Sequence, residues 1–143
     1  TVQILAEGAV EAEQVVTDGK ITFDAPVRYV SVGLGYTSQG QTMPLAAETA
    51  TSGAQGTIKN IVGVHARVSQ TSLFKVGPSF DKLTSNRSRL VSDDFDNPPS
   101  LQAGEQRVSI SGAWTPDGSV CWEQSDPLPL NVLSLTLEVV LGS

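Results

Sequence analysis

The chain has 143 residues, of which 39% are hydrophobic, 15 are acidic and 9 are basic, so its formal net charge is −6. This length suits a single domain, and no apolar run is long enough to cross a bilayer as a helix. The acidic excess argues against specific nucleic-acid binding, because phosphate contacts need clustered Lys and Arg, but it allows DNA to slide past without sticking.

The N-terminal segment predicts short strands joined by glycine turns. Residues 2–6 and 9–16 are expected to pair across Glu7-Gly8, although the Glu and Ala content of the second segment also suits a helix. Residues 17–20 lie between Val15-Val16 and the segment 21–23, and their central Asp18-Gly19 predicts a two-residue hairpin turn, because it supplies the positive backbone angles that such a turn requires.

Residues 28–36 predict the next strand, with an apolar row on one face: Val30, Val32, Leu34 and Tyr36. Glycines lie on the other face, where bare backbone permits a bend or close packing, and Tyr29 on this face is expected to be exposed. Residues 46–57, rich in Ala, Thr, Ser, Gly and Gln, offer nothing to anchor a core and predict a mobile loop.

The longest predicted strand covers residues 58–70. Its alternation assigns Val62, Val64, Ala66 and Val68 to the core, and directs His65, Arg67 and Ser69 the other way. A short strand over 73–76 is expected to end at Gly77-Pro78, with Phe80 and Leu83 filling the core beyond it. Residues 87–91 suit another strand, and 92–104 predict a long surface loop with three Asp and two adjacent Pro.

Alternation resumes over residues 106–114, which place Val108, Ile110 and Trp114 on one side. A turn over 115–118, set by Pro116 and Gly118, leads into a return strand in which Val120 and Trp122 face the core. Residues 126–130, with two prolines, form an extended bridge to the last strand. There Leu133, Leu135, Leu137, Val139 and Leu141 alternate with Ser134, Thr136, Glu138 and Val140.

These eight to ten segments, without a convincing helix, predict an all-β fold, either an antiparallel β-sandwich or a partly open β-barrel with long loops. Because the sequence lacks an initiator Met and opens on strand-like residues, we interpret residues 1–143 as one β-rich module of a longer or processed polypeptide.

Few side chains suggest chemistry. His65 is the only histidine, and a catalytic role would need an orienting carboxylate and a nucleophile nearby, neither of which its local sequence supplies. Cys121 is the only cysteine, so the chain forms no internal disulfide and no cysteine-based zinc site. Its neighbours are apolar or acidic, whereas a reactive thiol needs a cationic setting, so we expect a buried or half-buried structural residue.

Three further groups are weaker candidates. Asp93, Asp94 and Asp96 could offer oxygens to a hard cation, but they lack EF-hand spacing, which favours a solvated acidic loop. The glycine-rich segments 33–36 and 53–56 match no phosphate-binding loop. Trp114, Trp122, Tyr29 and Tyr36 could stack on sugars or bases. Both Trp side chains are expected to pack inward, and one exposed Tyr is not a binding site. We therefore assign no catalytic, cofactor or metal residue.

Five segments spread across nearly the whole chain carry a likeness to a known family in their strands and turns: residues 1–10, 15–22, 32–38, 77–84 and 124–135. Together they resemble the C-terminal part of tail proteins from short-tailed bacteriophages and related prophages. The resemblance implies a structural module of a tube, nozzle or hub protein in the virion tail. No catalytic residue carries over from the family.

The same resemblance implies partners and a location. The partners would be other tail proteins and copies of this chain in a ring, meeting through exposed strand edges or through the loops 46–57 and 92–104. Assembly would occur in the bacterial host cytoplasm, without membrane insertion, and an acidic wall would suit passive contact with ejected DNA.

Two rival hypotheses remain open. The first is a receptor- or carbohydrate-binding module, since β-sandwiches often use loops at one end for recognition. The second is a hydrolase that uses Asp93, Asp94 or Asp96, which would require carboxylates brought together by folding in a deep pocket.

Overall fold

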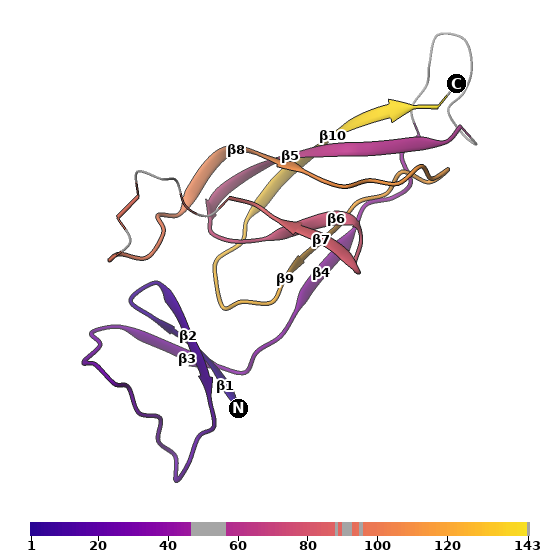
Figure 1. Cartoon of the computed structure of the whole chain (residues 1–143). Coiled ribbons are helices and arrows are strands. Elements are labelled where there is room, and N and C mark those ends of the chain that lie inside the picture. The colour runs from indigo at the N-terminus through magenta and orange to yellow at the C-terminus, as the bar shows by residue number, and fades with distance from the viewer. Residues whose placement is uncertain (47–56, 88, 90–92, 95, 143) are drawn as a thin grey trace.

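The protein is described by a computed structural model over residues 1–46, 57–87, 89, 93–94 and 96–142. Over these ranges the chain forms ten strands and no helix, and the strands make three antiparallel sheets (Figure 1). The all-β prediction is confirmed. The sheets do not close into a barrel, so of the two predicted architectures the structure is consistent with the sandwich.

The strand bounds, in chain order, are β1 (Val2–Ala6), β2 (Ala9–Gln14), β3 (Val30–Gly33), β4 (Ser38–Gln41), β5 (Lys59–Thr71), β6 (Lys75–Ser79), β7 (Lys82–Ser85), β8 (Gln102–Ser109), β9 (Cys121–Gln124) and β10 (Val132–Leu141). The sheet orders are β2-β1-β3, β10-β5-β8 and β4-β9-β6-β7.

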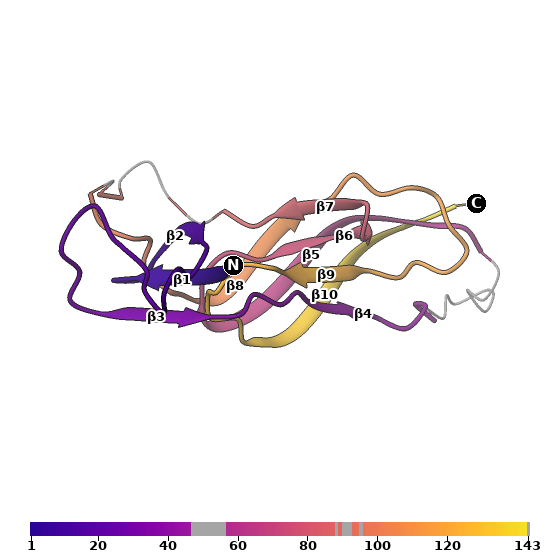
Figure 2. The same ribbon diagram turned by 90° about the horizontal axis from the view of Figure 1, so that it is seen from below.

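The core lies between the second and third of these sheets. Strands β5, β8 and β10 contribute one wall, while β6, β9 and the segments that precede them contribute the other. Figure 2 shows the N-terminal sheet at one end of this two-sheet body. The buried core residues are Ile61, Val64, Ala66, Val68, Phe74, Val76, Val108, Ile110 and Val120, with Trp122, Leu135, Leu137 and Val139 packed against them.

Strand β5 follows the predicted alternation except at its start. Val64, Ala66 and Val68 are buried as expected, but Val62 is 37% exposed and Ile61 is buried instead. The pairing with β10 passes from Gly63 to Ile61 while β10 advances by one residue, so Val62 is the extra residue of a β-bulge. A bulge reverses the faces of all residues beyond it, which is why the predicted core position is wrong.

Strand β10 shows the same effect. Leu135, Leu137 and Val139 pack on the core as predicted, whereas Leu133 is 64% exposed. From Val132 to Ser134, β10 advances by two residues while its partner β5 advances by only one. Leu133 is therefore the bulged residue and turns outward.

The N-terminal hairpin forms as predicted, in strand rather than helix. β1 and β2 pair antiparallel across Glu7 and Gly8, whose φ angles are 51° and 89°. Asp18 and Gly19 also take positive φ angles, of 52° and 73°, but their turn closes only a single bridge between Thr17 and Lys20. The predicted turn is therefore present, while the two strands expected to flank it are not.

Several predictions around the β6–β7 hairpin are wrong. β6 continues through Gly77 and Pro78 to Ser79, with a register shift relative to β7 that accommodates the missing proline N–H. Phe80 lies at the hairpin tip, 39% exposed, and Leu83 is only half-buried. The aromatic residue that fills the core is Phe74, which is 2% exposed.

The segment after β8 also departs from expectation. β8 ends at Ser109, so alternation does not extend to Trp114, which is 50% exposed. The turn at 115–118 is present, with Gly118 N–H donating to Thr115 Oγ1 at 3.2 Å. It does not close a hairpin, because β8 and β9 belong to different sheets. Val120 is buried and Trp122 packs on the core, as predicted.

The predicted loops are only partly described. The loop assigned to 46–57 and the strand assigned to 87–91 fall mainly outside the described residues. The loop assigned to 92–104 ends earlier than expected, since β8 begins at Gln102. Residues 126–130 form no strand, as predicted, and the carbonyl of Pro129 accepts the N–H of Ser72 at 3.1 Å. No described helix is long and apolar enough to span a membrane.

Candidate functional site

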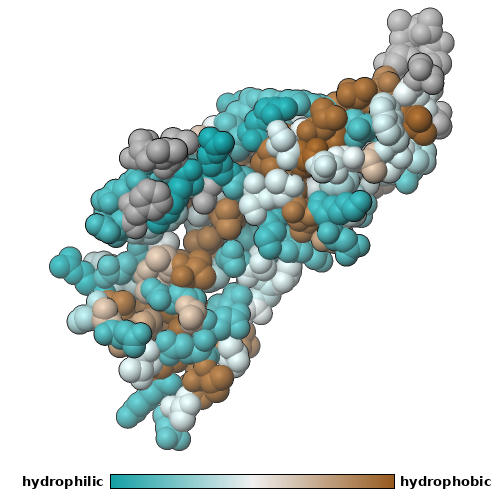
Figure 3. All heavy atoms as spheres, in the orientation of Figure 1, coloured by the Kyte–Doolittle hydropathy of each residue, from teal (hydrophilic) through white to brown (hydrophobic). Residues whose placement is uncertain are grey.

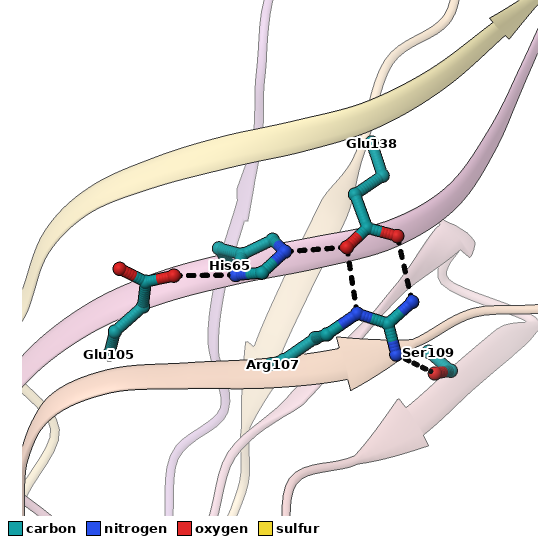
Figure 4. A network of polar contacts seen from close by, with 5 residues as sticks. All are labelled: His65, Glu105, Arg107, Ser109 and Glu138. Atoms are coloured by element: carbon teal, nitrogen blue, oxygen red, sulfur yellow. Dashed lines mark hydrogen bonds and ion pairs between the residues drawn. The ribbon is translucent and has the colours of Figure 1, made fainter.

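A polar cluster lies on the outer face of the β10-β5-β8 sheet, as Figure 4 shows. His65 on β5 stands between two carboxylates, with Nδ1 2.6 Å from Glu105 Oε1 on β8 and Nε2 2.5 Å from Glu138 Oε1 on β10. Arg107 on β8 donates to both oxygens of Glu138, each at 2.7 Å. Its third nitrogen donates to Ser109 Oγ at 2.8 Å. One network thus ties all three strands together.

Strand register explains how these residues meet. His65 pairs with Thr136 on one side and with Arg107 on the other, so its ring reaches the two glutamates diagonally. Gly63 pairs with both Glu138 and Ser109, and a Cβ at Gly63 would lie 2.7 Å from Glu138 Oε2. The missing side chain at Gly63 leaves room for the Arg107–Glu138 ion pair.

The cluster shifts the proton affinities of its members. Hydrogen bonds to Glu138 and then Glu105 raise the pKa of His65 above 6.5, despite an opposing effect of burial. Arg107 and His65 lower the pKa of Glu138 from 4.5 to about 2. The side chain of His65 is 27% exposed, so solvent screens part of these interactions.

The local sequence of His65 supplies no orienting carboxylate, but folding brings one from a distant strand to each side of the ring. Both ring nitrogens are occupied by glutamates, and Ser109 contacts Arg107 rather than the imidazole. The network therefore links β5, β8 and β10, and we call His65, Glu105, Arg107 and Glu138 the cross-strand clasp. His65, Arg107 and Glu138 occupy outward-facing positions of the predicted segments 58–70, 106–114 and 133–141, but the order of these strands is needed to bring them together. Glu105 lies just before the second of these segments and is not singled out by the sequence pattern.

The other candidates are separate from this cluster. Cys121 is buried, as predicted, and burial raises the pKa of its thiol. In the acidic loop, the Asp94 carboxylate accepts the N–H of Asp96 at 3.1 Å and the amide of Asn97 at 2.7 Å. Arg89 donates to the carbonyls of Asp94 and Asn97. Among the described residues, no group of His, Cys, Asp and Glu is placed to hold a metal ion.

The aromatic candidates divide between core and surface. Trp122 packs inward and Trp114 does not, whereas Tyr29 and Tyr36 are each 79% exposed. Tyr36 lines two adjoining grooves between the N-terminal sheet and the loop after β9, the first with a volume of about 290 Å³. Residues 33–36 open no helix, and 53–56 lie outside the described residues.

The exposed hydrophobic residues concentrate at the edge of the N-terminal sheet. All four residues of β3 are exposed, and Figure 3 shows hydrophobic surface over this end of the molecule. We call residues 29–36 the β3 edge segment. It contains no charged residue and no proline, and its large side chains are exposed by 45–83%: Tyr29, Val30, Val32, Leu34 and Tyr36.

Comparison with known proteins adds no identification. No family model matches the chain, and no curated protein matches it significantly. The resemblance to phage tail proteins therefore rests on the sequence segments alone, while the structure defines an all-β protein with a cross-strand polar clasp and an apolar sheet edge.

Proposed function

We propose that this chain is a structural component of a phage or prophage virion tail, of tube, nozzle or hub type, that acts by subunit assembly and not by catalysis. The sequence resemblance supplies the tail context, and the β3 edge segment supplies the means of assembly. Other tail proteins and further copies of this chain are the proposed partners, and the virion tail is the proposed location.

The observation that carries this proposal is the unprotected apolar edge of β3. Exposed strand edges pair with other chains unless charges, prolines or bulges prevent it. The β3 edge segment has neither charge nor proline, and Tyr29, Leu34 and Tyr36 are each more than three-quarters exposed there. Such a surface is expected of a protein that is covered by a neighbour in its working state.

The test is complementation of a phage that lacks this gene. We expect Val32→Lys to block tail assembly, seen by electron microscopy and as lost infectivity, because it places a charge on the pairing edge. Val15→Lys is the matched control, since Val15 is 70% exposed but lies outside the strands. Normal tails and infectivity with Val32→Lys would contradict the proposed role of this edge.

One observation favours a second candidate, a receptor- or carbohydrate-binding module. The exposed ring of Tyr36 borders a groove that also presents Gln3, Gln124 and Asp126, a combination of aromatic and polar groups that suits a sugar. Binding to a glycan array that is lost in Tyr36→Ala and retained in Tyr29→Ala, which alters an equally exposed ring, would support it. Absence of any glycan binding would contradict this second candidate function.

A further inference from the structure

We propose that two copies of this chain pair through the open edges of their β3 strands, antiparallel and about a two-fold axis, to form a continuous six-stranded sheet. This inference deepens the proposed function, since it assumes assembly and names the partner of the β3 edge as a second copy. It also specifies the register: the backbone limits which residues can face one another, and the side chains select one of the allowed registers.

The first argument is that β3 is the exception among the sheet edges. β2 carries Glu11 and Glu13 and a register shift; β8 carries Glu105 and Arg107; β7 begins with Lys82. β10 contains Glu138 and two register shifts, and β4 presents no apolar side chain. These features block or weaken edge pairing, and β3 has none of them.

The backbone of β3 shows which groups are free to pair. Glu7 N–H donates to the carbonyl of Tyr29 at 3.0 Å, and the pairing with β1 continues in the same register through Ser31 and Gly33. In an antiparallel pair the residues alternate between directing their backbone groups toward the partner and away from it. Val30 and Val32 therefore direct their N–H and C=O groups toward the open edge.

A two-fold antiparallel pair must bring outward-directed residues opposite one another. Any axis centred on a residue of β3 does so, and the side chains select among them. Centring on Val32 makes Val32 face its own counterpart and Val30 face Leu34 of the second copy. Centring on Ser31 would instead place the charged Arg28 opposite Leu34. Leu34 follows β3 directly and is 83% exposed, so the strand needs to lengthen by one residue. All contacts in the row are then aliphatic, as cross-strand neighbours in a stable sheet usually are.

The row of side chains at Val30, Val32 and Leu34 also continues the buried face of the N-terminal sheet. Val30 and Val32 pair with Ala6 and Ile4 of β1, and directly paired residues share a face. Ile4 is fully buried and Ala6 is 3% exposed, whereas Val30 and Val32 are each 45% exposed. The apolar face thus stops at an open edge, where the second copy extends it.

The absence of charge in the β3 edge segment permits contact between the β3 edges of two copies. Each chain carries a formal charge of −6, so most surfaces of two copies repel one another. The β3 edge segment carries no charge, and the residue just before it is Arg28. Pairing at this edge therefore sets no charged side chain of the segment against another.

Cysteine crosslinking tests the register. Paired residues of this kind have Cα atoms about 5.5 Å apart, within the range that a disulfide spans. Under mild oxidation, Val32→Cys should form a covalent dimer on a non-reducing gel, and so should the double variant Val30→Cys/Leu34→Cys. Val30→Cys alone should stay monomeric, and the wild type serves as control because Cys121 is buried.

Each other outcome overturns the inference. Equal crosslinking of Val30→Cys and Val32→Cys would mean another register or random collision. No crosslinking in any variant, with monomers at all concentrations, would mean that a second copy does not bind this edge. If tail assembly still failed with Val32→Lys in that case, the proposed function would stand, with a different tail protein as the occupant.

Discussion

His65 shows how one residue can acquire a role from strands far away in the sequence. Its two hydrogen-bonded partners, Glu105 and Glu138, lie on β8 and β10, so no neighbour of His65 in the sequence indicates them. The sequence correctly placed His65 on the outer face of its strand, because alternation determines the face. It could not place the glutamates, because strand order is a property of the whole sheet.

The clasp predicts a pH-dependent contribution to stability. Because the folded-state pKa of His65 is raised above 6.5, the stabilisation is complete below pH 6.5 and is lost as pH rises through the raised value. We expect the melting temperature of the wild type to fall more between pH 6 and about pH 9 than that of His65→Gln. If the melting temperatures of the two proteins fell by the same amount over this pH range, the stabilising role of the clasp would be contradicted.

Glu138 predicts the opposite dependence at acidic pH. Its folded-state pKa is lowered from 4.5 to about 2, so its stabilisation is present above pH 4.5 and lost as pH falls toward 2. Glu138→Gln should therefore reduce the difference in stability between pH 5 and about pH 2.5. Urea unfolding at both pH values measures this, and Glu13→Gln, on the exposed edge strand β2, is the control.

At the scale of elements, β-bulges explain two core positions that alternation predicted wrongly. Val62 and Leu133 stand where one strand carries an extra residue, and the burial of neighbouring residues changes phase there. Strand segments and most turns were predictable from alternation and from Asp-Gly or Pro-Gly signals. Bulges were not, because an extra residue is accommodated by the partner strand and leaves no mark in its own sequence.

The aromatic residues near β6 provide a direct test of the core. Phe74 is 2% exposed and Phe80 is 39% exposed, whereas the sequence predicted that Phe80 would fill the core. Phe74→Ala should lower the free energy of unfolding by about 3–5 kcal/mol, and Phe80→Ala by about 1 kcal/mol or less. Denaturant titration would contradict the structure if the two losses were equal.

The β6–β7 hairpin depends on a glycine. A side chain at Gly77 would overlap the backbone carbonyl of Lys82, which cannot move without breaking the hairpin. Gly77→Ala should therefore lower the free energy of unfolding by about 1–3 kcal/mol. Gly33→Ala is the matched control, because a Cβ there would meet nothing within 4 Å and the φ of Gly33 is not positive. Similar stabilities of the two variants would contradict this account.

At the scale of the whole molecule, the charged network and the apolar edge lie on different sheets. The β10-β5-β8 sheet carries the charged network on its outer face, whereas the N-terminal sheet ends in the uncharged β3 edge segment. The first arrangement holds three strands of one chain together. The second leaves donors, acceptors and aliphatic side chains free for another chain, which is the physical basis of the proposed assembly.

The most direct test of that assembly is sedimentation equilibrium of the wild type and Val32→Lys over a wide concentration range. The account predicts that the wild type passes from the 15.0 kDa monomer to twice that mass as concentration rises, and that Val32→Lys remains a monomer. A wild type that stays monomeric throughout, or a Val32→Lys variant that associates equally well, would contradict self-pairing through β3.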